Sequence, residues 1–290
     1  MDIWVVVALI VIIATTLYSY YRQLSYSLVA SVACAALFAM MVGVSDASHY
    51  THSTTFVEMA FTPKDLIDTE HFYTVCTSMF THADFGHLLM NILGLAFLGT
   101  IFEQRIGVRH FIVIYILAGV CGTLLLAALR WNDTVFVVGA SGAISGILGA
   151  FARMFPNERM MIIFIPFIPM RTWTIVGLFL LLQIFYAIGS ANIAVEAHVG
   201  GLVAGLATAP YVVKMPLHRR VKKMISLNAL RRLARTPELK AIIRRLEDEE
   251  IADVRSAWIE EFLSKAKCPH CGARIRISRE TITCERGHML

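Results

Sequence analysis

Seven apolar stretches follow one another along the first 213 residues, and they restrict this chain to the folds of integral membrane proteins. Most approach the ~20 apolar residues that a helix needs to cross the hydrocarbon core. The stretches cover residues 3–20, 27–44, 87–101, 110–129, 141–155, 171–188 and 193–213. A mean hydropathy of +0.65, with 57% apolar residues, agrees with this interpretation. We therefore predict an all-α polytopic membrane helical bundle.

Lys and Arg residues near the ends of these stretches predict the orientation in the membrane. They follow the first, third, fifth and seventh stretches, whereas the alternate loops contain only Lys64 and Arg130. We expect a multi-pass protein of the plasma membrane with an external N-terminus and a cytoplasmic C-terminal tail. The N-terminal sequence has neither a basic region nor a small-residue cleavage site, so the first helix should remain in the mature protein.

The fifth stretch is too short to cross the membrane, and it opens with Gly139-Ala140-Ser141-Gly142. As a helix, residues 141–155 would measure about 22 Å against a hydrocarbon core of roughly 30 Å. Ser141 should therefore lie below the membrane surface, and residues 133–140 should dip into the bilayer. Irregular backbone is tolerated there only against protein or water. The pattern predicts a serine in a wet hollow inside a membrane protein.

Polar residues recur near the start of the third, fifth and seventh stretches, which all run in the same direction. His87 and Asn91, Ser141, and His198 should therefore meet in the external half of the membrane. His87 and Asn91 are four residues apart and share a helix face, whereas His82 should point elsewhere. Taken singly, Asn91 could be an interhelical hydrogen-bond partner and a histidine could cap a loop.

Together these residues suit acyl transfer. A serine hydroxyl needs an adjacent base, and His198 can accept its proton near neutral pH. The Ser141 amide, His87 and Asn91 could hold the oxyanion of a tetrahedral intermediate. No carboxylate is placed to orient His198, which favours a Ser-His dyad. Small residues let helix backbones approach closely. We therefore expect a packing role for Gly139, Gly142, Gly201 and Gly205.

The motifs Gly139-Ala140-Ser141-Gly142, 197–205 (AHVGGLVAG) and 82–91 (HADFGHLLMN) resemble the rhomboid family of intramembrane serine proteases. The resemblance covers about residues 27–213, a six-helix core, and leaves one additional N-terminal helix. It implies cleavage of a single-span membrane protein within the lipid bilayer, without a catalytic cofactor. It also implies Ser141 as nucleophile, His198 as general base and acid, His87 and Asn91 as oxyanion donors, and His82 as a structural residue.

Two positions depart from the family pattern. Tyr73-Thr74 stands where the family often has Trp-Arg in the external loop, and Ser145 stands where an aromatic residue often supports the catalytic histidine. These differences bear on loop anchoring and on the support of His198.

From Lys214 onward the composition changes to a basic tail that holds 18 of the 26 Lys and Arg residues. Beside a membrane, such a tail more often reflects the positive-inside bias and binding to anionic membrane lipid than nucleic-acid binding, so we expect membrane lipid as a partner and no nucleic acid. Thr236-Pro237-Glu238 predicts the start of a helix that continues to about Ala266. We expect four parts: an extra helix (1–24), the catalytic core (25–214), a basic helical linker (215–266) and a small C-terminal domain (267–290).

The C-terminal cysteines have the spacing of a structural metal site. Cys268, Cys271, Cys284 and His288 give C-x2-C-x12-C-x3-H, which suits tetrahedral zinc. Residues 274–277 and 281–283 alternate as two short strands, so a zinc ribbon is predicted. Such a ribbon could bind a protein partner. The alternative is a short tail with free thiols or a disulfide.

Three functional hypotheses remain. The leading one is a prokaryotic rhomboid-like serine endopeptidase that cuts its substrate near the external membrane face. The second is a catalytically weak or inactive rhomboid-like protein that binds membrane clients. In the third, the zinc ribbon carries the main function and the helices only anchor it.

Overall fold

The computed structural model describes residues 2–45, 50–162, 165–189, 193–215, 217, 227–249, 252–278 and 281–290. The chain divides into two compact units, Met1–Val212 and Val213–Leu290. The basic residues at 219, 220, 222 and 223, which contributed to the predicted orientation, lie outside the described residues.

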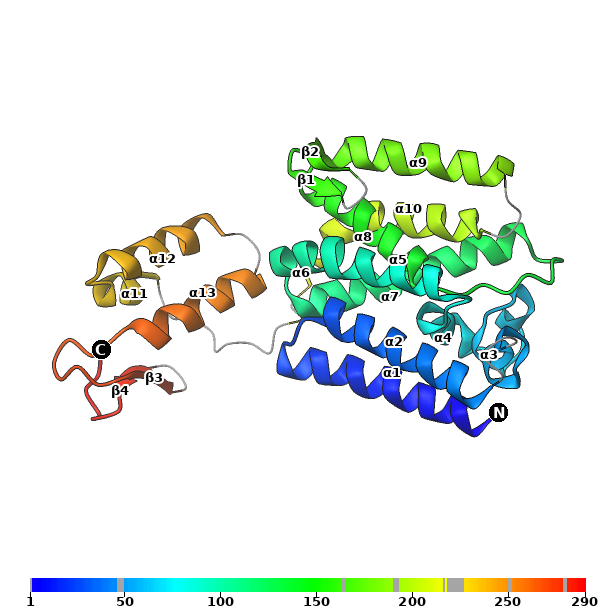
Figure 1. The fold of residues 1–290 in the computed structure, drawn as a ribbon. Coiled ribbons are helices and arrows are strands. Elements are labelled where there is room, and N and C mark those ends of the chain that lie inside the picture. Colours follow the sequence, from blue (N-terminus) through cyan, green and yellow to red (C-terminus); the bar gives the residue numbers. More distant parts are fainter. Residues whose placement is uncertain are drawn as a thin grey trace. The chain divides into compact units, whose positions relative to one another are not determined.

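The first unit is a helical bundle (Figure 1). Its main helices are α1 (Ile3–Arg22), α2 (Tyr26–Val44), α5 (Phe85–Gly94), α6 (Thr100–Ile106), α7 (Val108–Leu129), α8 (Ser141–Met154), α9 (Thr172–Gly189) and α10 (Val195–Val212). A π-helical turn, Leu95–Gly99, joins α5 to α6 as one helix. Within the described residues, five helices are long and apolar enough to cross a membrane: Ile3–Arg22, Tyr26–Val44, Phe85–Ile106, Val108–Leu129 and Thr172–Gly189. The predicted multi-pass membrane bundle is confirmed.

The centre of the bundle is formed by α7, α8 and α10, which pack against one another. In Figure 1, α1 and α2 lie on one side of these helices and α9 on the other. Between α8 and α10 the contact is so close that a Cβ atom on Gly201 would collide with the carbonyl oxygen of Gly142. One turn further, a Cβ on Gly205 would collide with the carbonyl of Gly146. The predicted small-residue faces therefore bring two backbones into direct contact.

Short helices and turns fill the long connection between α2 and α5. They are Tyr50–His52, α3 (Thr54–Met59), Pro63–Leu66, α4 (Thr74–Thr77) and Ser78–Phe80. Asp65 ties this connection together, because it accepts hydrogen bonds from the Thr62 amide (2.8 Å) and the buried Thr74 hydroxyl (2.8 Å). At the Tyr73-Thr74 departure, the loop is thus anchored through a threonine–carboxylate bond.

A hairpin that the sequence did not predict lies between α8 and α9. Strands β1 (Arg159–Ile162) and β2 (Ile165–Arg171) pair antiparallel, with Arg159 opposite Arg171 and Met160 opposite Met170. The segment is rich in isoleucine and aromatic residues, which favour strands, but it merges with the apolar stretch that follows.

The second unit combines helices with a two-stranded sheet. Its elements are α11 (Leu227–Leu233), α12 (Pro237–Asp248), α13 (Ala252–Lys265), β3 (Ile275–Ser278) and β4 (Thr281–Cys284). The strands pair antiparallel, and Ile275 and Ile282 join the helices in one apolar cluster. Leu246 and Phe262 are fully buried in it. The predicted linker and ribbon therefore share a hydrophobic core.

The prediction of one helix from Thr236 to about Ala266 is wrong. Thr236 does cap a helix, by accepting a hydrogen bond from the Leu239 amide. This helix, α12, ends at Asp248 because Glu249 adopts an extended conformation with φ −89° and ψ 117°. The break lets Phe262 of α13 pack against the apolar face of α12, which an uninterrupted helix would prevent.

Candidate active site

Ser141 is the first residue of α8, whose 14 residues would be about 21 Å long. The preceding segment is held by backbone hydrogen bonds to the connection between α2 and α5. Phe61 and Val137 exchange two bonds, of 3.0 and 2.8 Å, and the Gly139 amide donates to the carbonyl of Ser78 (2.8 Å). Irregular backbone at membrane depth needs such partners. The serine is thus placed on a short helix with an anchored entry.

His198 lies in the first turn of α10, facing the start of α8. Its Nε2 atom is 2.7 Å from the Ser141 Oγ atom. This distance is typical of an O–H···N hydrogen bond. The close backbone contact between α8 and α10 makes the bond possible. The structure therefore brings together the two residues that the sequence placed 57 positions apart.

His87 and Asn91 occupy one face of α5, as predicted. Asp84 caps this helix by accepting a hydrogen bond from the His87 amide (2.8 Å). Asn91 is buried and its Nδ2 atom donates to the His87 carbonyl (2.8 Å), which leaves one N–H of the amide group for another acceptor. Its Oδ1 atom has no hydrogen-bond partner.

Gly139 brings His87 close to the serine. Its φ of +107° is unfavourable for other residues, and a Cβ atom here would collide with the His87 ring at Nε2. The His87 ring therefore packs on the backbone two residues before Ser141. The start of α8 also presents the Ser141 N–H, which has no acceptor within the helix.

The expectation that His82 points away from His87 is wrong. The two rings pack edge to face, with centroids 5.2 Å apart. Helical spacing does not apply, because α5 begins only at Phe85 and His82 lies in the preceding loop. His82 is fully buried, and its carbonyl accepts a hydrogen bond from the Tyr50 hydroxyl (3.2 Å). It lies where it can hold His87 in place.

Gln183 is the residue at this site that the sequence reasoning missed. Its Oε1 atom lies 2.8 Å from the Nδ1 atom of His198. It comes from α9, where it is 4% exposed, and Phe179 of the same helix packs its ring 6.3 Å from the imidazole. A buried amide within an apolar membrane helix is itself a signal of function. Gln183 lies in the sixth apolar stretch, whereas the predicted site used polar residues of the third, fifth and seventh stretches only.

Ser145, the second departure from the family pattern, does not support His198. Its hydroxyl donates to the Ser141 carbonyl one turn earlier (2.7 Å). The two contacts described for the His198 ring, from Gln183 and Phe179, therefore come from α9 and not from the serine-bearing helix.

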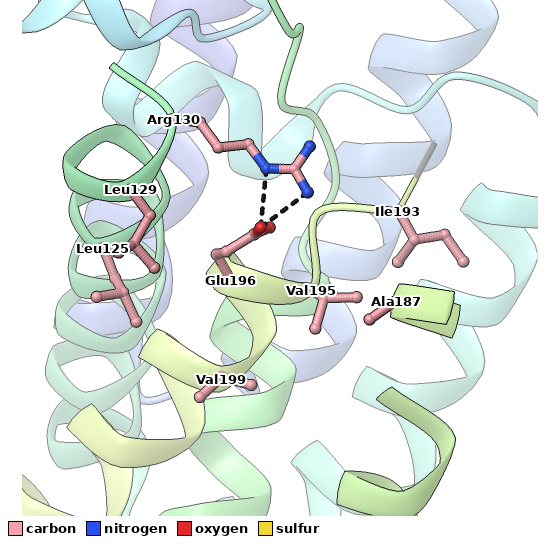
Figure 2. Close-up of a pocket in the computed structure, with 8 residues that line it drawn as sticks. All are labelled: Leu125, Leu129, Arg130, Ala187, Ile193, Val195, Glu196 and Val199. Carbon is pink, nitrogen blue, oxygen red and sulfur yellow. Dashed lines mark hydrogen bonds and ion pairs between the residues drawn. The ribbon is translucent and has the colours of Figure 1, made fainter. Parts of the chain in front are cut away.

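Two hollows lie near the pair. A small one of about 20 Å³ borders Ser141 and Gly139, and it has roughly the volume of a single water molecule. A larger one of about 470 Å³ lies between the ends of α7, α9 and α10 (Figure 2). Arg130 and Glu196 form an ion pair beside it, with a nitrogen–oxygen distance of 2.8 Å, and Figure 2 shows this pairing. This larger hollow does not border Ser141, so its size alone does not mark the reactive centre.

The four predicted metal ligands converge in the second unit. The Sγ atoms of Cys268, Cys271 and Cys284 and a ring nitrogen of His288 lie within 4.8 Å of one another. Cys271 and Cys284 are 3.6 Å apart, and Nδ1 of His288 is 3.3 Å from Cys284 and 3.8 Å from Cys268. Tetrahedral zinc with Zn–S bonds near 2.3 Å separates its sulfurs by about 3.8 Å. The cluster could hold a metal ion, and its three cysteines are free thiols in this structure.

Backbone turns prepare these ligands. The Gly272 amide donates to the Cys268 carbonyl (2.9 Å) and the Gly287 amide to that of Cys284 (2.8 Å), and both glycines have positive φ. Burial tends to raise the pKa of the Cys284 thiol. Backbone N–H groups of His288 and Arg286, with the Cys271 and His288 side chains, outweigh it and lower this pKa to about 6. A thiolate is the form that binds metal.

The sequence matches the rhomboid domain over residues 69–215, about half of the chain, and this protein belongs to the rhomboid family. It is 28% identical over 159 residues to "Rhomboid protein 1, mitochondrial" of Saccharomyces cerevisiae, covering 52% of this chain and 45% of that protein. It is 28% identical over 156 residues to "Rhomboid protease GluP" of Bacillus subtilis, covering 53% and 29%. With "RHOMBOID-like protein 12, mitochondrial" of Arabidopsis thaliana the identity is 30% over 156 residues, covering 47% and 46%.

The chain thus spans less than half the length of these relatives. The family, the multi-pass helical bundle and the hydrogen-bonded serine–histidine pair define a rhomboid-type intramembrane protease or rhomboid-like protein.

Proposed function

We propose that this protein is an intramembrane serine endopeptidase that cleaves membrane-anchored proteins. The observation that carries the proposal is the 2.7 Å hydrogen bond between Ser141 Oγ and His198 Nε2. A pair in which a hydroxyl already contacts its base is the arrangement that nucleophilic catalysis needs. An inactive client-binding protein has no requirement for it.

Ser141 and His198 carry out the proton transfers. His198 Nε2 removes the hydroxyl proton while Ser141 Oγ attacks the substrate carbonyl, which forms a tetrahedral oxyanion. The imidazolium then gives this proton to the leaving amine as the peptide bond breaks. In the second half, His198 takes a proton from water as the water oxygen attacks the acyl carbon, and the imidazolium then returns that proton to Ser141 Oγ as the acyl bond breaks.

The oxyanion is held by donors around the start of α8. We assign this role to the Ser141 N–H, the free N–H of the Asn91 amide group and the ring of His87. The position of the His87 ring on Gly139 supports the assignment, since it places the ring beside the backbone that leads into Ser141. Donors fixed in advance stabilise charge that develops only in the transition state.

The substrate is a single-span membrane protein. Ser141 begins a helix too short to span, so the bond to be cut lies within the outer part of the bilayer near the external face. A regular helix keeps its carbonyls hydrogen-bonded, so small or helix-weakening residues in the substrate mark the cleavage site.

We further propose a plasma-membrane protein with an external N-terminus and a cytoplasmic second unit. The Lys and Arg distribution of the sequence supports this orientation. In the second unit, Cys268, Cys271, Cys284 and His288 hold structural zinc, because three thiolates and an imidazole are a donor set that zinc prefers. We divide the chain into an extra helix (1–24), the catalytic core (25–214), a linker (215–266) and the ribbon (267–290).

The decisive experiment is active-site labelling of the purified full chain with a serine-directed fluorophosphonate. We expect labelling at Ser141, and Ser141→Ala and His198→Ala should each lower cleavage of a membrane substrate on the order of 10⁴-fold or more. The double variant should be scarcely worse than either single variant, because the two residues act as a unit.

Ser145→Ala is the matched control, since it removes a hydroxyl one turn away that does not contact His198. It should still be labelled at Ser141. A folded native protein that neither reacts with the probe nor cleaves a membrane substrate would leave the client-binding hypothesis as the better one.

A further inference from the structure

His198 has a hydrogen-bond partner on each of its two ring nitrogens. Nε2 contacts Ser141 Oγ at 2.7 Å, and Nδ1 contacts Gln183 Oε1 at 2.8 Å. The three side chains therefore form a line that runs from α8 through α10 to α9. Serine-base sites in which a third group orients the base have this arrangement.

The role of His198 as a base fixes the direction of the second bond. If Nε2 is to accept the hydroxyl proton, it must be unprotonated, and the proton of the neutral ring then resides on Nδ1. An N–H at this position needs an acceptor. The amide oxygen of Gln183 is one, and unlike a carboxylate it carries no net charge to bury within the membrane.

Gln183 is buried on a helix that is otherwise largely exposed. The buried residues of α9 are Thr172, Ile175, Val176 and Gln183. The first three lie in its first two turns, so Gln183 is the buried contact of its second half. Phe179 lies four residues earlier on the same face and packs against the His198 ring. One face of α9 therefore supplies an acceptor and an apolar contact to one imidazole.

A structural role is the alternative, because polar residues often link membrane helices through hydrogen bonds. Two observations favour a role at the site. The bond of Gln183 goes to the ring atom opposite the one that contacts the serine. Ser145, on the serine-bearing helix, is occupied by its bond to the Ser141 carbonyl and offers the imidazole no support.

We propose that Gln183 is the positioning residue of His198. It selects the tautomer with hydrogen on Nδ1, fixes the ring against Ser141, and stabilises the imidazolium, while Phe179 supports the ring. This inference rests on the proposed protease function. No proton passes to Gln183: the proton from Ser141 moves to Nε2 and then to the leaving amine, and the Nδ1–H bond to Oε1 persists throughout.

The test compares replacements of Gln183 in the full-length chain reconstituted in liposomes. Gln183→Met keeps the length of the side chain but removes the amide acceptor. Gln183→Asn keeps an amide but withdraws it by one methylene. Gln183→Glu restores an acceptor oxygen at the original distance. Gln104→Met is the matched control, since Gln104 is an exposed residue of α6.

We expect Gln183→Met and Gln183→Asn to lower kcat and the fluorophosphonate labelling rate by roughly 10- to 100-fold, the effect of losing a hydrogen bond to a charged group. KM should change less than about twofold, because the substrate does not contact this bond. Gln183→Glu should recover most of the rate, and Gln104→Met should behave as the native protein.

The final labelled fraction separates slow chemistry from loss of fold. A native final fraction reached slowly supports positioning. If Gln183→Met, Gln183→Asn and Gln183→Glu all lost the same share of activity, and this loss equalled the decrease in the final labelled fraction, Gln183 would have a packing role. That result would overturn the proposal. Native labelling rates in the Met and Asn variants would overturn it as well, while leaving the protease intact. If the native chain itself reacts with neither probe nor substrate, both the protease function and this inference fall together.

Discussion

The backbone of Gly139 lies directly against the His87 ring, with no room for a Cβ atom between Cα and Nε2. A glycine two residues before Ser141 therefore determines where the His87 ring lies, and His87 is a side chain that we propose as an oxyanion donor. This contact leads to the first of four predictions.

Gly139→Ala should impair turnover by displacing His87. The added methyl group collides with the ring, and φ of +107° is strained for alanine. We expect a loss of turnover on the order of 10²-fold, similar to the loss of one oxyanion donor. Substrate cleavage normalised to folded protein measures it.

The control and the specific test use other substitutions. Gly43→Ala adds a methyl group where nothing lies within 4 Å, so it should be neutral. In a His87→Ala background the collision disappears, and Gly139→Ala should then cost much less than it does alone. Additive losses would mean that Gly139 acts through the backbone alone.

His87→Ala and Asn91→Ala should each lower kcat by about 10²- to 10³-fold without abolishing activity. Their combined effect should be less than additive if they serve one oxyanion. Fluorophosphonate reactivity should persist, because His198 still contacts Ser141. If Asn91→Ala left turnover unchanged and unfolded the protein, Asn91 would be an interhelical hydrogen-bond residue instead.

Glu103 should be essential for stability rather than for turnover. This buried carboxylate of α6 accepts hydrogen bonds from the amides of Tyr26 (2.5 Å) and Ser27 (3.1 Å) and from the hydroxyl of Ser25 (2.7 Å). These are the first amides of α2, which no intrahelical acceptor satisfies.

Glu103→Ala would leave them without this partner and should destabilise the protein by about 2–4 kcal/mol. Thermal unfolding in detergent measures the loss, and Glu70→Ala, at an exposed position in the connection between α2 and α5, is the control. Unchanged unfolding of Glu103→Ala would contradict the capping role.

Removal of metal should unfold the second unit and leave the membrane bundle intact. Zinc measured in reduced, freshly purified protein should be about one equivalent, and a chelator should remove it with loss of β-structure. Cys284→Ser and Cys271→Ser should bind less zinc, whereas Cys34→Ser in the bundle should bind the native amount. A native zinc content in both ligand variants would disprove the assignment of these four ligands.

Hydropathy and motif spacing were sufficient to predict the membrane bundle and to select the residues that meet at its centre. Ser141 and His198 could be paired because helices that run in the same direction bring their starts to one depth, and small residues allow contact. The Cys and His spacing likewise predicted the cluster in the second unit, because ligands on tight turns need only local geometry.

Side-chain details that depend on tertiary packing were beyond such reasoning. His82 was misplaced because helical periodicity was applied to a residue that precedes the helix. Gln183 was missed because only the three-dimensional position of α9 brings its amide to His198. The break at Glu249 depends on the apolar contact between α12 and α13, and the hairpin between α8 and α9 could not be distinguished from the apolar stretch that follows it.

The glycine contacts between α8 and α10 have a consequence for how this site responds to a substrate. Since Gly142 and Gly201 meet backbone to backbone, no side chain lies between them that could change its conformation to alter the spacing of the two helices. The reactive pair is preorganised: its alignment exists before any substrate enters. In the protease that we propose, the free energy of substrate binding is then available for unwinding the substrate helix and orienting its carbonyl, instead of being used to assemble the nucleophile and its base.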